Sequence, residues 1–339
     1  MASRARIEDI CEKLGLSKAT VSKALNGYET VREETRARVL ACAREIGYAQ
    51  TGNSPDVRAR FTRVGITMTS LLGNPHGITP YQPLFTSLTE ELEQFHFETV
   101  LLPPSLVQEQ IVPYDQAMRN LNLDCAFLTG LRMDDPYYHQ LQTTELPTVL
   151  WDMSIRNPFV HCVSSDSTEG MRMAASYLIQ LGHRRIGLIL GHRQAQVSLQ
   201  RRDGYLLALV DAGIPLDPEL IFEGDFSETS GALGFYALME KGVTAILCVC
   251  DMAALGVYRA ARTRGIRIPE DLSIVGYDNT ALTSYTVPEL TSVDQHPDQI
   301  GKVIATTIHN MMRHHPVGDS VLRPSMVIRG STAAPPSAL

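Results

Sequence analysis

The feature that most constrains the fold is an alternation of short apolar runs with amphipathic stretches, which begins at Val64 and continues to residue 312. The runs have the length of buried strands, and the stretches have the apolar spacing of helices. Alternating βα units build parallel sheets that are covered by helices on both faces. The predicted strands are 64–68, 99–102, 125–128, 148–150, 186–190, 245–249 and 273–275, and the predicted helices are 84–95, 116–121, 168–181, 199–212, 229–241, 252–264 and 299–312.

There are too many units for one sheet, and the pattern restarts near the run His183-Arg184-Arg185-Ile186-Gly187. We therefore expect two Rossmann-like halves. Sheets of this kind bind ligands beyond the carboxyl ends of their strands. Two such halves that face each other form a cleft, which closes by a hinge motion.

The N-terminal segment has a different, helical pattern. Ile7, Ile10, Cys11 and Leu14 are spaced as one apolar stripe of a helix, which Gly15 ends. A three-residue turn leads to a second helix, and this is the spacing of a helix-turn-helix.

The second helix has both ends marked. Ser17 is a good N-cap, because its hydroxyl accepts a bond from an unpaired N–H of the first turn, and Asn26-Gly27 ends the helix. Val21 and Leu25 share one face, and the remaining surface carries Lys18, Thr20, Ser22 and Lys23. We predict that this helix enters the major groove of DNA. The alternative is a surface helical bundle, since a helix-turn-helix pattern alone gives many false positives.

A third helix follows the second one. Thr30 and Glu33 have the spacing of a capping box, in which the hydroxyl and the carboxylate each satisfy a backbone N–H. Val39, Ala43 and Ile46 are then expected to face inward. The three helices would enclose a small core.

Charge is distributed unevenly along the chain. Residues 1–63 contain 12 Lys/Arg and 8 Asp/Glu, a net charge of +4, whereas residues 64–339 have a net charge of −11. Because phosphates repel an acidic body, the sequence confines DNA binding to the N-terminal end.

Other features exclude several classes of protein. The six cysteines, at 11, 42, 125, 162, 248 and 250, form no CxxC or CxxH pattern, so we expect reduced, mostly buried thiols and no metal site or cofactor. No apolar run reaches the ~18 residues of a membrane span, and no apolar signal core follows the basic N-terminus. We expect a cytoplasmic protein without a membrane partner.

Residues 6–48 resemble the DNA-binding module of the lactose-repressor/galactose-repressor (LacI/GalR) family. The resemblance rests on Ile7-Glu8-Asp9-Ile10, Leu14-Gly15-Leu16-Ser17, Ala19-Thr20-Val21-Ser22-Lys23, Leu25-Asn26-Gly27, Val31, Glu34-Thr35-Arg36, Val39-Leu40 and Gly47-Tyr48. It implies that Lys18, Ala19 and Lys23 face base edges while Thr20, Ser22 and Asn26 hold the backbone. Lysine suits the guanine acceptors, and a methyl group suits thymine. The candidate DNA-binding residues are thus Ser17, Lys18, Ala19, Thr20, Ser22, Lys23, Asn26 and, in the linker, Val57.

The body resembles the effector-binding core of the same family, which is related to periplasmic sugar-binding proteins. The matching stretches begin at Leu181, Arg201, Glu223, Asp251, Ile268 and Pro288. The resemblance implies chain crossovers near Val163, Val293 and Met326. It divides the chain into a helix-turn-helix domain (1–48), a hinge linker (49–63), a core (64–331) and a tail (332–339) that we expect to be disordered. Subdomain one comprises 64–163 with 294–325, and subdomain two comprises 164–293 with 326–331.

The linker departs from the family. The resemblance implies a hinge helix whose apolar residue wedges into the minor groove, and Val57 lies at that position. Gly52 and Pro55 are unusual there, although Ser54 as N-cap with Pro55 after it permits a helix. A flexible tether is the alternative.

The resemblance also assigns effector-binding residues. Arg201 lies three residues before Gly204, as in the family, and its forked donors suit two hydroxyls or a carboxylate. A surface salt bridge is the alternative role, and Arg202 is a rival for the site. Asp278 would accept hydroxyl bonds unless it caps a helix. Phe226 would stack on the ligand unless it packs in the core.

Three weaker candidates complete the effector site. Asp152 follows a predicted strand. Cys250 replaces the family's usual asparagine and is a poor hydrogen-bonding partner. Tyr81 ends a loop that is longer than the family's version.

Together these features predict a transcriptional repressor that binds double-stranded DNA at a near-palindromic operator as a homodimer. We expect it to respond to a small-molecule effector, which we predict to be a sugar. A sugar-binding or transport protein is the first alternative, and the basic N-terminal module argues against it. An enzyme is the second, but no GxSxG, P-loop, GxGxxG or HExxH motif is present, so we predict no catalytic residues.

Overall fold

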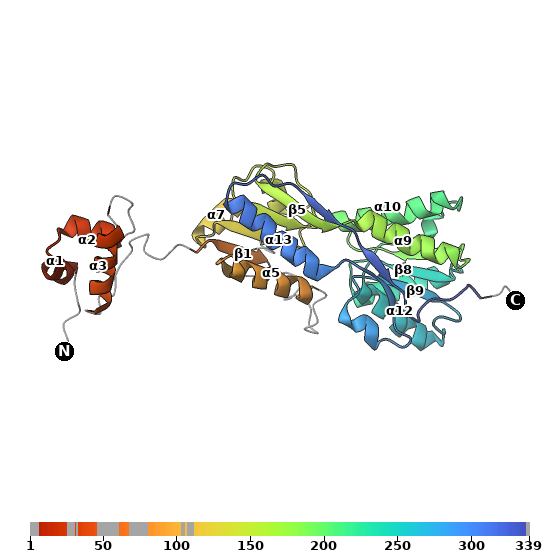
Figure 1. Ribbon diagram of the computed structural model, residues 1–339. Coiled ribbons are helices and arrows are strands. Elements are labelled where there is room, and N and C mark those ends of the chain that lie inside the picture. The colour runs from red at the N-terminus through yellow and green to blue at the C-terminus, as the bar shows by residue number, and fades with distance from the viewer. Residues whose placement is uncertain are drawn as a thin grey trace. The chain divides into compact units, whose positions relative to one another are not determined.

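The computed structural model describes residues 7–25, 31, 33–45, 61–67, 81–102, 106 and 112–336 (Figure 1). The chain divides into two compact units, 1–61 and 62–339. Several predictions lie outside the described residues. They are the roles of Asn26 and Val57, the helix end at Asn26-Gly27, the Thr30/Glu33 capping box, the inward position of Ile46, the form of the linker as far as residue 60 and the tail after residue 336.

The described residues of the first unit form three helices, α1 (Ile7–Leu14), α2 (Lys18–Leu25) and α3 (Glu33–Glu45). Ser17 is confirmed as the residue that caps α2, because its Oγ accepts a hydrogen bond from the Thr20 N–H at 3.1 Å. The predicted apolar stripes also meet in one core, formed by Ile10, Val21, Ala24, Val31, Val39, Cys42 and Ala43, with Ile7, Cys11, Leu14 and Leu16 packed against it. This small core holds the outer surface of α2 in place.

The second unit contains two sheets, and we call the part built on each sheet a lobe. The sheet of lobe 1 has the strand order β11-β5-β4-β3-β1-β2 and is parallel throughout. Its strands are β1 (Arg63–Thr67), β2 (Glu98–Leu102), β3 (Cys125–Leu128), β4 (Thr148–Trp151), β5 (Val160–Ser165) and β11 (Ser320–Leu322), and its helices are α5 (Gln82–Gln94), α7 (Tyr114–Asn120), α8 (Pro136–Gln140) and α13 (Pro297–Met312).

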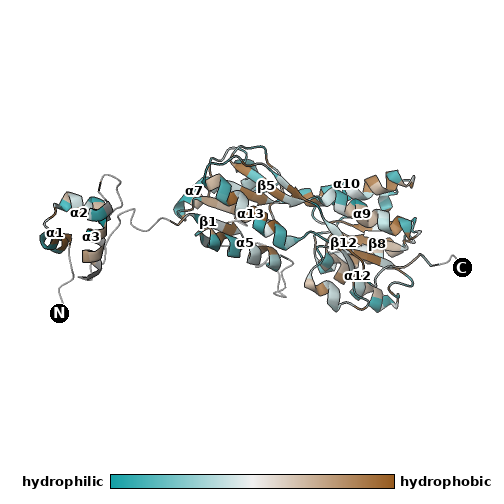
Figure 2. Ribbon diagram, viewed as in Figure 1, coloured by the Kyte–Doolittle hydropathy of each residue, from teal (hydrophilic) through white to brown (hydrophobic). Residues whose placement is uncertain are grey.

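The helices of lobe 1 cover both faces of this sheet, because neighbouring residues of a strand point to opposite sides. Phe127 packs in one cluster with residues of α5 and α13. Its neighbour Ala126 packs in another cluster with residues of α7 and α8. Figure 2 shows apolar strands beneath helices of mixed polarity.

Lobe 2 repeats this architecture with the strand order β12-β10-β9-β8-β6-β7, in which β12 alone of the described strands is antiparallel to its neighbour. Ile246 and Leu247 point to the two opposite cores. The strands are β6 (Ile186–Ile189), β7 (Ile221–Phe222), β8 (Ala245–Cys248), β9 (Ser273–Tyr277), β10 (Thr291–Asp294) and β12 (Ser325–Val327). The α-helices are α9 (Ser167–Gln180), α10 (Gln196–Asp211), α11 (Glu228–Met239) and α12 (Asp251–Arg264). The 3-10 helices are η1 (Pro218–Leu220) and η2 (Ala281–Tyr285).

The predicted fold class is confirmed by these two parallel-dominated sheets, and each lobe is discontinuous in sequence. The chain passes from lobe 1 to lobe 2 between β5 and α9, returns between β10 and α13, and passes again between β11 and β12. Ser165 still pairs with Leu322 in the sheet of lobe 1, so the first crossover lies two residues later than predicted.

The prediction of a disordered tail is wrong for residues 332–336. The Ala333 N–H donates to Ser273 Oγ at 3.0 Å, and the Ala333 carbonyl oxygen lies 2.9 Å from His183 Nε2. The Thr332 and Tyr177 hydroxyls are 2.8 Å apart. The composition of the tail concealed this, because backbone groups and a few polar side chains on lobe 2 hold it.

Candidate functional site

The outer surface of α2 presents most of the predicted DNA-binding residues. Lys18, Ala19 and Lys23 are exposed, whereas Thr20 and Ser22 are half-buried. The three exposed side chains are accessible for contacts with base edges, and the two half-buried hydroxyls are placed for contacts with the DNA backbone. The contacts themselves remain predictions.

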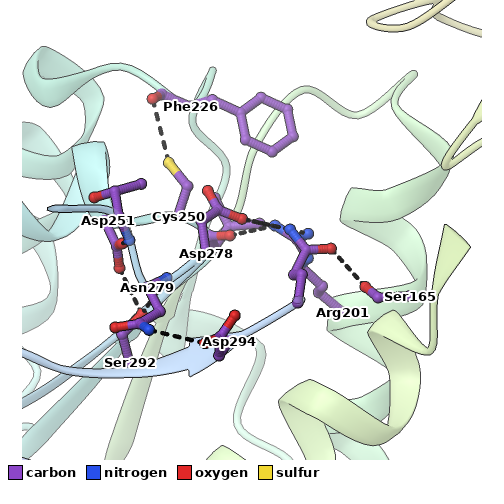
Figure 3. A network of polar contacts seen from close by, with 12 residues as sticks. Ser165, Arg201, Phe226, Cys250, Asp251, Asp278, Asn279, Ser292 and Asp294 are labelled. Carbon is purple, nitrogen blue, oxygen red and sulfur yellow. Dashed lines mark hydrogen bonds and ion pairs between the residues drawn. The ribbon is translucent and has the colours of Figure 1, made fainter. Parts of the chain in front are cut away.

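A second group of predicted residues gathers where the carboxyl ends of the two sheets of the second unit meet (Figure 3). Asp152 follows β4 of lobe 1, while Cys250 and Asp278 follow β8 and β9 of lobe 2. Arg201 lies on α10, and Tyr81 is the N-cap residue of α5. Parallel topology explains the convergence, because every strand of such a sheet ends on the same edge.

Arg201 is the centre of this cluster. Its side chain is 4% exposed, its Nη1 donates to the Val249 carbonyl at 2.5 Å, and its Nη2 lies 3.9 Å from Asp278 Oδ1. Its guanidinium carbon stacks 3.7 Å from the centre of the Tyr277 ring. The neighbouring Arg202 is partly exposed and pairs with Asp203 at 3.1 Å, so Arg201 and not its rival belongs to the cluster.

Asp278 connects Arg201 to both lobes. Its Oδ1 accepts a 2.6 Å bond from Gln295 Nε2, and Gln295 Oε1 accepts a 2.5 Å bond from the Ser165 hydroxyl of lobe 1. Burial raises the pKa of Asp278, while Arg201 opposes that rise. The alternative role as a helix cap is wrong, because Thr280 occupies the N-cap position of η2.

Asp152 comes from the opposite lobe and has an incomplete set of partners. Its backbone is left-handed, with φ of 59°, and its Oδ1 is buried without a hydrogen-bonding partner among the described residues. Burial raises the pKa of this carboxyl from 3.8 to about 7, with Arg201 opposing and Asp278 adding to the rise. Asp152 is therefore only partly ionised near neutral pH.

Phe226 packs in the core, and its stacking on a ligand stays a prediction. Its ring is half-buried and packs against the core cluster that contains Phe235. The ring also lies over Gly191, where it occupies the place that a Cβ would take. Its carbonyl accepts a 3.3 Å bond from the Cys250 thiol, and burial raises the pKa of that thiol to about 12. Cys250 is thus a neutral, buried donor beside the cluster.

Asp251 stabilises the structure of the site, because its carboxylate is bonded to other residues of lobe 2. Its carboxylate accepts bonds of 2.7 Å from the Thr280 N–H and from the Ser292 hydroxyl. Burial raises its pKa, and the charge of Asp278 raises it further. It thereby fixes the loop that presents Asp278.

Sequence reasoning missed four residues of this cluster, namely Trp151, Ser165, Tyr277 and Gln295. The Trp151 ring lies 4.5 Å from the Tyr81 ring, at 89° to it, and its indole N–H is buried without a partner among the described residues. All four lie at or just after the carboxyl end of a strand. That position was a signal for Trp151 and Tyr277, which lie just after predicted strands, but not for Ser165 and Gln295, because β5 and β10 were not predicted.

The cluster leaves several buried polar atoms unsatisfied within the described residues, among them Trp151 Nε1, Asp152 Oδ1 and Arg201 Nε. Buried polar groups in proteins almost always have partners, so atoms of this kind mark a ligand site. Donors, an acceptor and aromatic rings suit a ligand with several hydroxyls. The described residues contain no group of three or more His, Cys, Asp or Glu that could hold a metal ion, and no described helix is long and apolar enough to span a membrane.

Comparisons with known proteins find relatives of both units of the chain. Residues 6–50 match the family model of bacterial regulatory proteins, lacI family, and residues 175–332 match a periplasmic binding protein-like domain. An uncharacterized HTH-type transcriptional regulator in the aml 5' region of Streptomyces limosus is 34% identical in an alignment of 346 positions, which covers 97% of this chain and 94% of that protein.

Solved structures extend the similarity to the whole chain. A complex of the transcriptional regulator CelR with cellobiose is 26% identical with a TM-score of 0.72, and the match covers 97% of this chain and 100% of that one. The lac repressor dimer bound to operator and the anti-inducer ONPF is 25% identical with a TM-score of 0.74, and the match covers 98% of this chain and 100% of that one.

Proposed function

Since the chain belongs to the lacI family of bacterial regulatory proteins, we propose that it is a transcriptional repressor whose affinity for an operator is set by a sugar bound between its two lobes. One observation carries this proposal. A single chain combines a capped, exposed helix with a two-lobed body whose sheets converge on a buried, partly unsatisfied polar cluster.

The DNA half of the proposal places α2 in the major groove. Lys18, Ala19 and Lys23 would contact base edges, and the hydroxyls of Thr20 and Ser22 would contact phosphates. Ser17, Asn26 and the linker residue Val57 complete the set that we propose from the family. The lac repressor structure that resembles this chain is a dimer on its operator, which supports a homodimer on a near-palindromic site.

The effector half of the proposal places an uncharged sugar at the cluster around Arg201. Asp152 and Asp278 would accept hydroxyl bonds, the guanidinium would donate, and Tyr81, Trp151 and Phe226 would offer aromatic surface. Asp278 and Asp152 already surround the one buried arginine of the described cluster, so an anionic ligand would add negative charge to a site that has an excess of carboxyls. The cellobiose complex of CelR supports a neutral sugar.

Two assays test the two halves. For the DNA half, a Lys18→Ala/Lys23→Ala variant should bind a selected operator at least about 10-fold more weakly than the wild type, because each good base contact contributes about 1–3 kcal/mol. An Arg262→Ala/Arg264→Ala variant, which removes two cations from α12, is the matched control and should bind normally. Full, salt-sensitive operator affinity in the Lys18/Lys23 variant would refute the assignment of α2.

For the effector half, neutral sugars, nucleosides and sugar phosphates are screened by thermal shift on the full chain. A neutral sugar should stabilise the wild type and the Arg202→Ala control, but not Arg201→Ala. Arg201→Lys guards against misfolding, because it keeps the charge and loses only the fork of donors. Unchanged sugar affinity in both Arg201 variants would refute the site, and recovery of the sugar unaltered would agree with binding rather than catalysis.

A further inference from the structure

The recognition helix has an ion pair that ties it to the first helix. Lys18, the first residue of α2, donates from Nζ to Oε1 of Glu8 on α1 at 2.6 Å. Both side chains are largely exposed, at 68% for Lys18 and 59% for Glu8. The pair is thus accessible to anything that approaches the N-terminal end of α2.

That end of the helix is the part that meets DNA in a helix-turn-helix. The N-terminal residues of the second helix contact base edges, and the first helix crosses the phosphate backbone. A lysine there can bind any phosphate, which adds affinity without sequence preference. It can also donate to O6 and N7 of guanine, which adds specificity.

The carboxylate of Glu8 changes the balance between these two uses. An exposed ion pair contributes only about 0–1 kcal/mol, so a well-placed base edge can displace it. A contact between Lys18 and a mobile phosphate gains less binding free energy when it replaces the ion pair. Lys18 then loses the carboxylate of Glu8, and that carboxylate also repels the phosphate. The same pair therefore penalises unspecific contacts more than specific ones.

We propose that Glu8 is a specificity-determining residue, which withholds Lys18 from the phosphates of non-operator DNA and releases it to a base edge of the operator. This inference rests on the proposed entry of α2 into the major groove. It gives α1 a role in sequence selection, although α1 itself need not contact a base.

The test is the salt dependence of binding to a non-operator duplex by the full chain. The slope of log K against log salt counts phosphate contacts at about 0.9 for each. In Glu8→Gln, Lys18 loses this carboxylate and the phosphates lose its repulsion, so the slope should steepen by about 0.9, which is a further ~3-fold change in affinity between 50 and 200 mM salt. Operator affinity should rise less, and the ratio of operator to non-operator affinity should fall.

Two further variants separate the ion pair from simple charge. Glu12→Gln removes the same charge from an exposed position one turn further along α1, and should leave the slope at the wild-type value. The double variant Glu8→Gln/Lys18→Met removes the released lysine, and should also return to that value. Equal slopes in Glu8→Gln and Glu12→Gln would overturn the inference while DNA binding itself stands. A wild-type chain without salt-dependent DNA binding would overturn both the inference and the proposed function.

Discussion

Replacing Asp152 by asparagine should remove a large pH-dependent contribution to the stability of the core. The carboxyl pKa rises from 3.8 to about 7 on folding, mainly because burial disfavours the ionised form. A raised folded-state pKa means that the folded protein holds its proton more tightly than the unfolded chain. The contribution is therefore fully present below pH ~4 and is lost as the pH rises through ~7.

The magnitude follows from this shift. Each pKa unit corresponds to about 1.4 kcal/mol, and the part that falls between pH 5 and pH 8 amounts to about 2.5 kcal/mol. Asp152 keeps partial access to solvent, so we expect the free energy of unfolding of the wild type to fall by about 1–2.5 kcal/mol more than that of Asp152→Asn over this range.

The assay is urea unfolding of the full chain at several pH values, with the transition of the core followed separately. Asp298→Asn, which changes an exposed aspartate at the start of α13, is the control and should follow the wild type. If the difference between Asp152→Asn and the wild type is the same at pH 5 and pH 8, the carboxyl is not protonated by burial and the electrostatic account of the cluster fails.

Three other changes test the packing. Ser17→Ala should destabilise the first unit by about 0.5–2 kcal/mol in thermal unfolding, since the Thr20 N–H loses its cap, whereas Ser17→Asp should not. Gly204→Ala should destabilise lobe 2 by several kcal/mol, because a Cβ there would lie 2.1 Å from the Thr168 carbonyl oxygen between α9 and α10. Gly318→Ala, at a position with open space around it, should lose far less stability. Alkylation of the native chain at pH 8, followed by mass spectrometry, should label half-exposed Cys11 before Cys125, Cys248 and Cys250. Burial raises the pKa values of these three thiols and keeps them protonated. Equal labelling of all four cysteines would contradict the burial of these three.

Much of the fold was predictable because its strands are buried on both faces and read as continuous apolar runs. β3 was predicted at its observed bounds, 125–128. β5 (Val160–Ser165) was missed because His161 and two serines interrupt its apolar pattern, although it lies inside the sheet. β11 and β12 have three residues each, and such short edge strands give no periodicity to detect.

The candidate site was predictable only in part. Arg201 and Asp278 were found from motif spacing, and the structure brings them together. Gln295 and Trp151 carry no motif, and their place in the cluster follows from long-range pairing of strands that spacing alone does not encode. Whether Arg201 or Arg202 faces the site also depends on the rotation of α10, which only the packed structure fixes.

Sugar binding at the Arg201 cluster and operator binding at α2 should be coupled within one chain, and a linkage experiment measures this coupling directly. The operator affinity of the full chain is measured with and without a saturating neutral sugar, and the sugar affinity is measured with and without operator. We expect both affinities to change by one common factor, about 5- to 150-fold, and the factor to fall to one in Arg201→Lys. Operator affinity that is the same with and without the bound sugar would show that the two sites are not coupled.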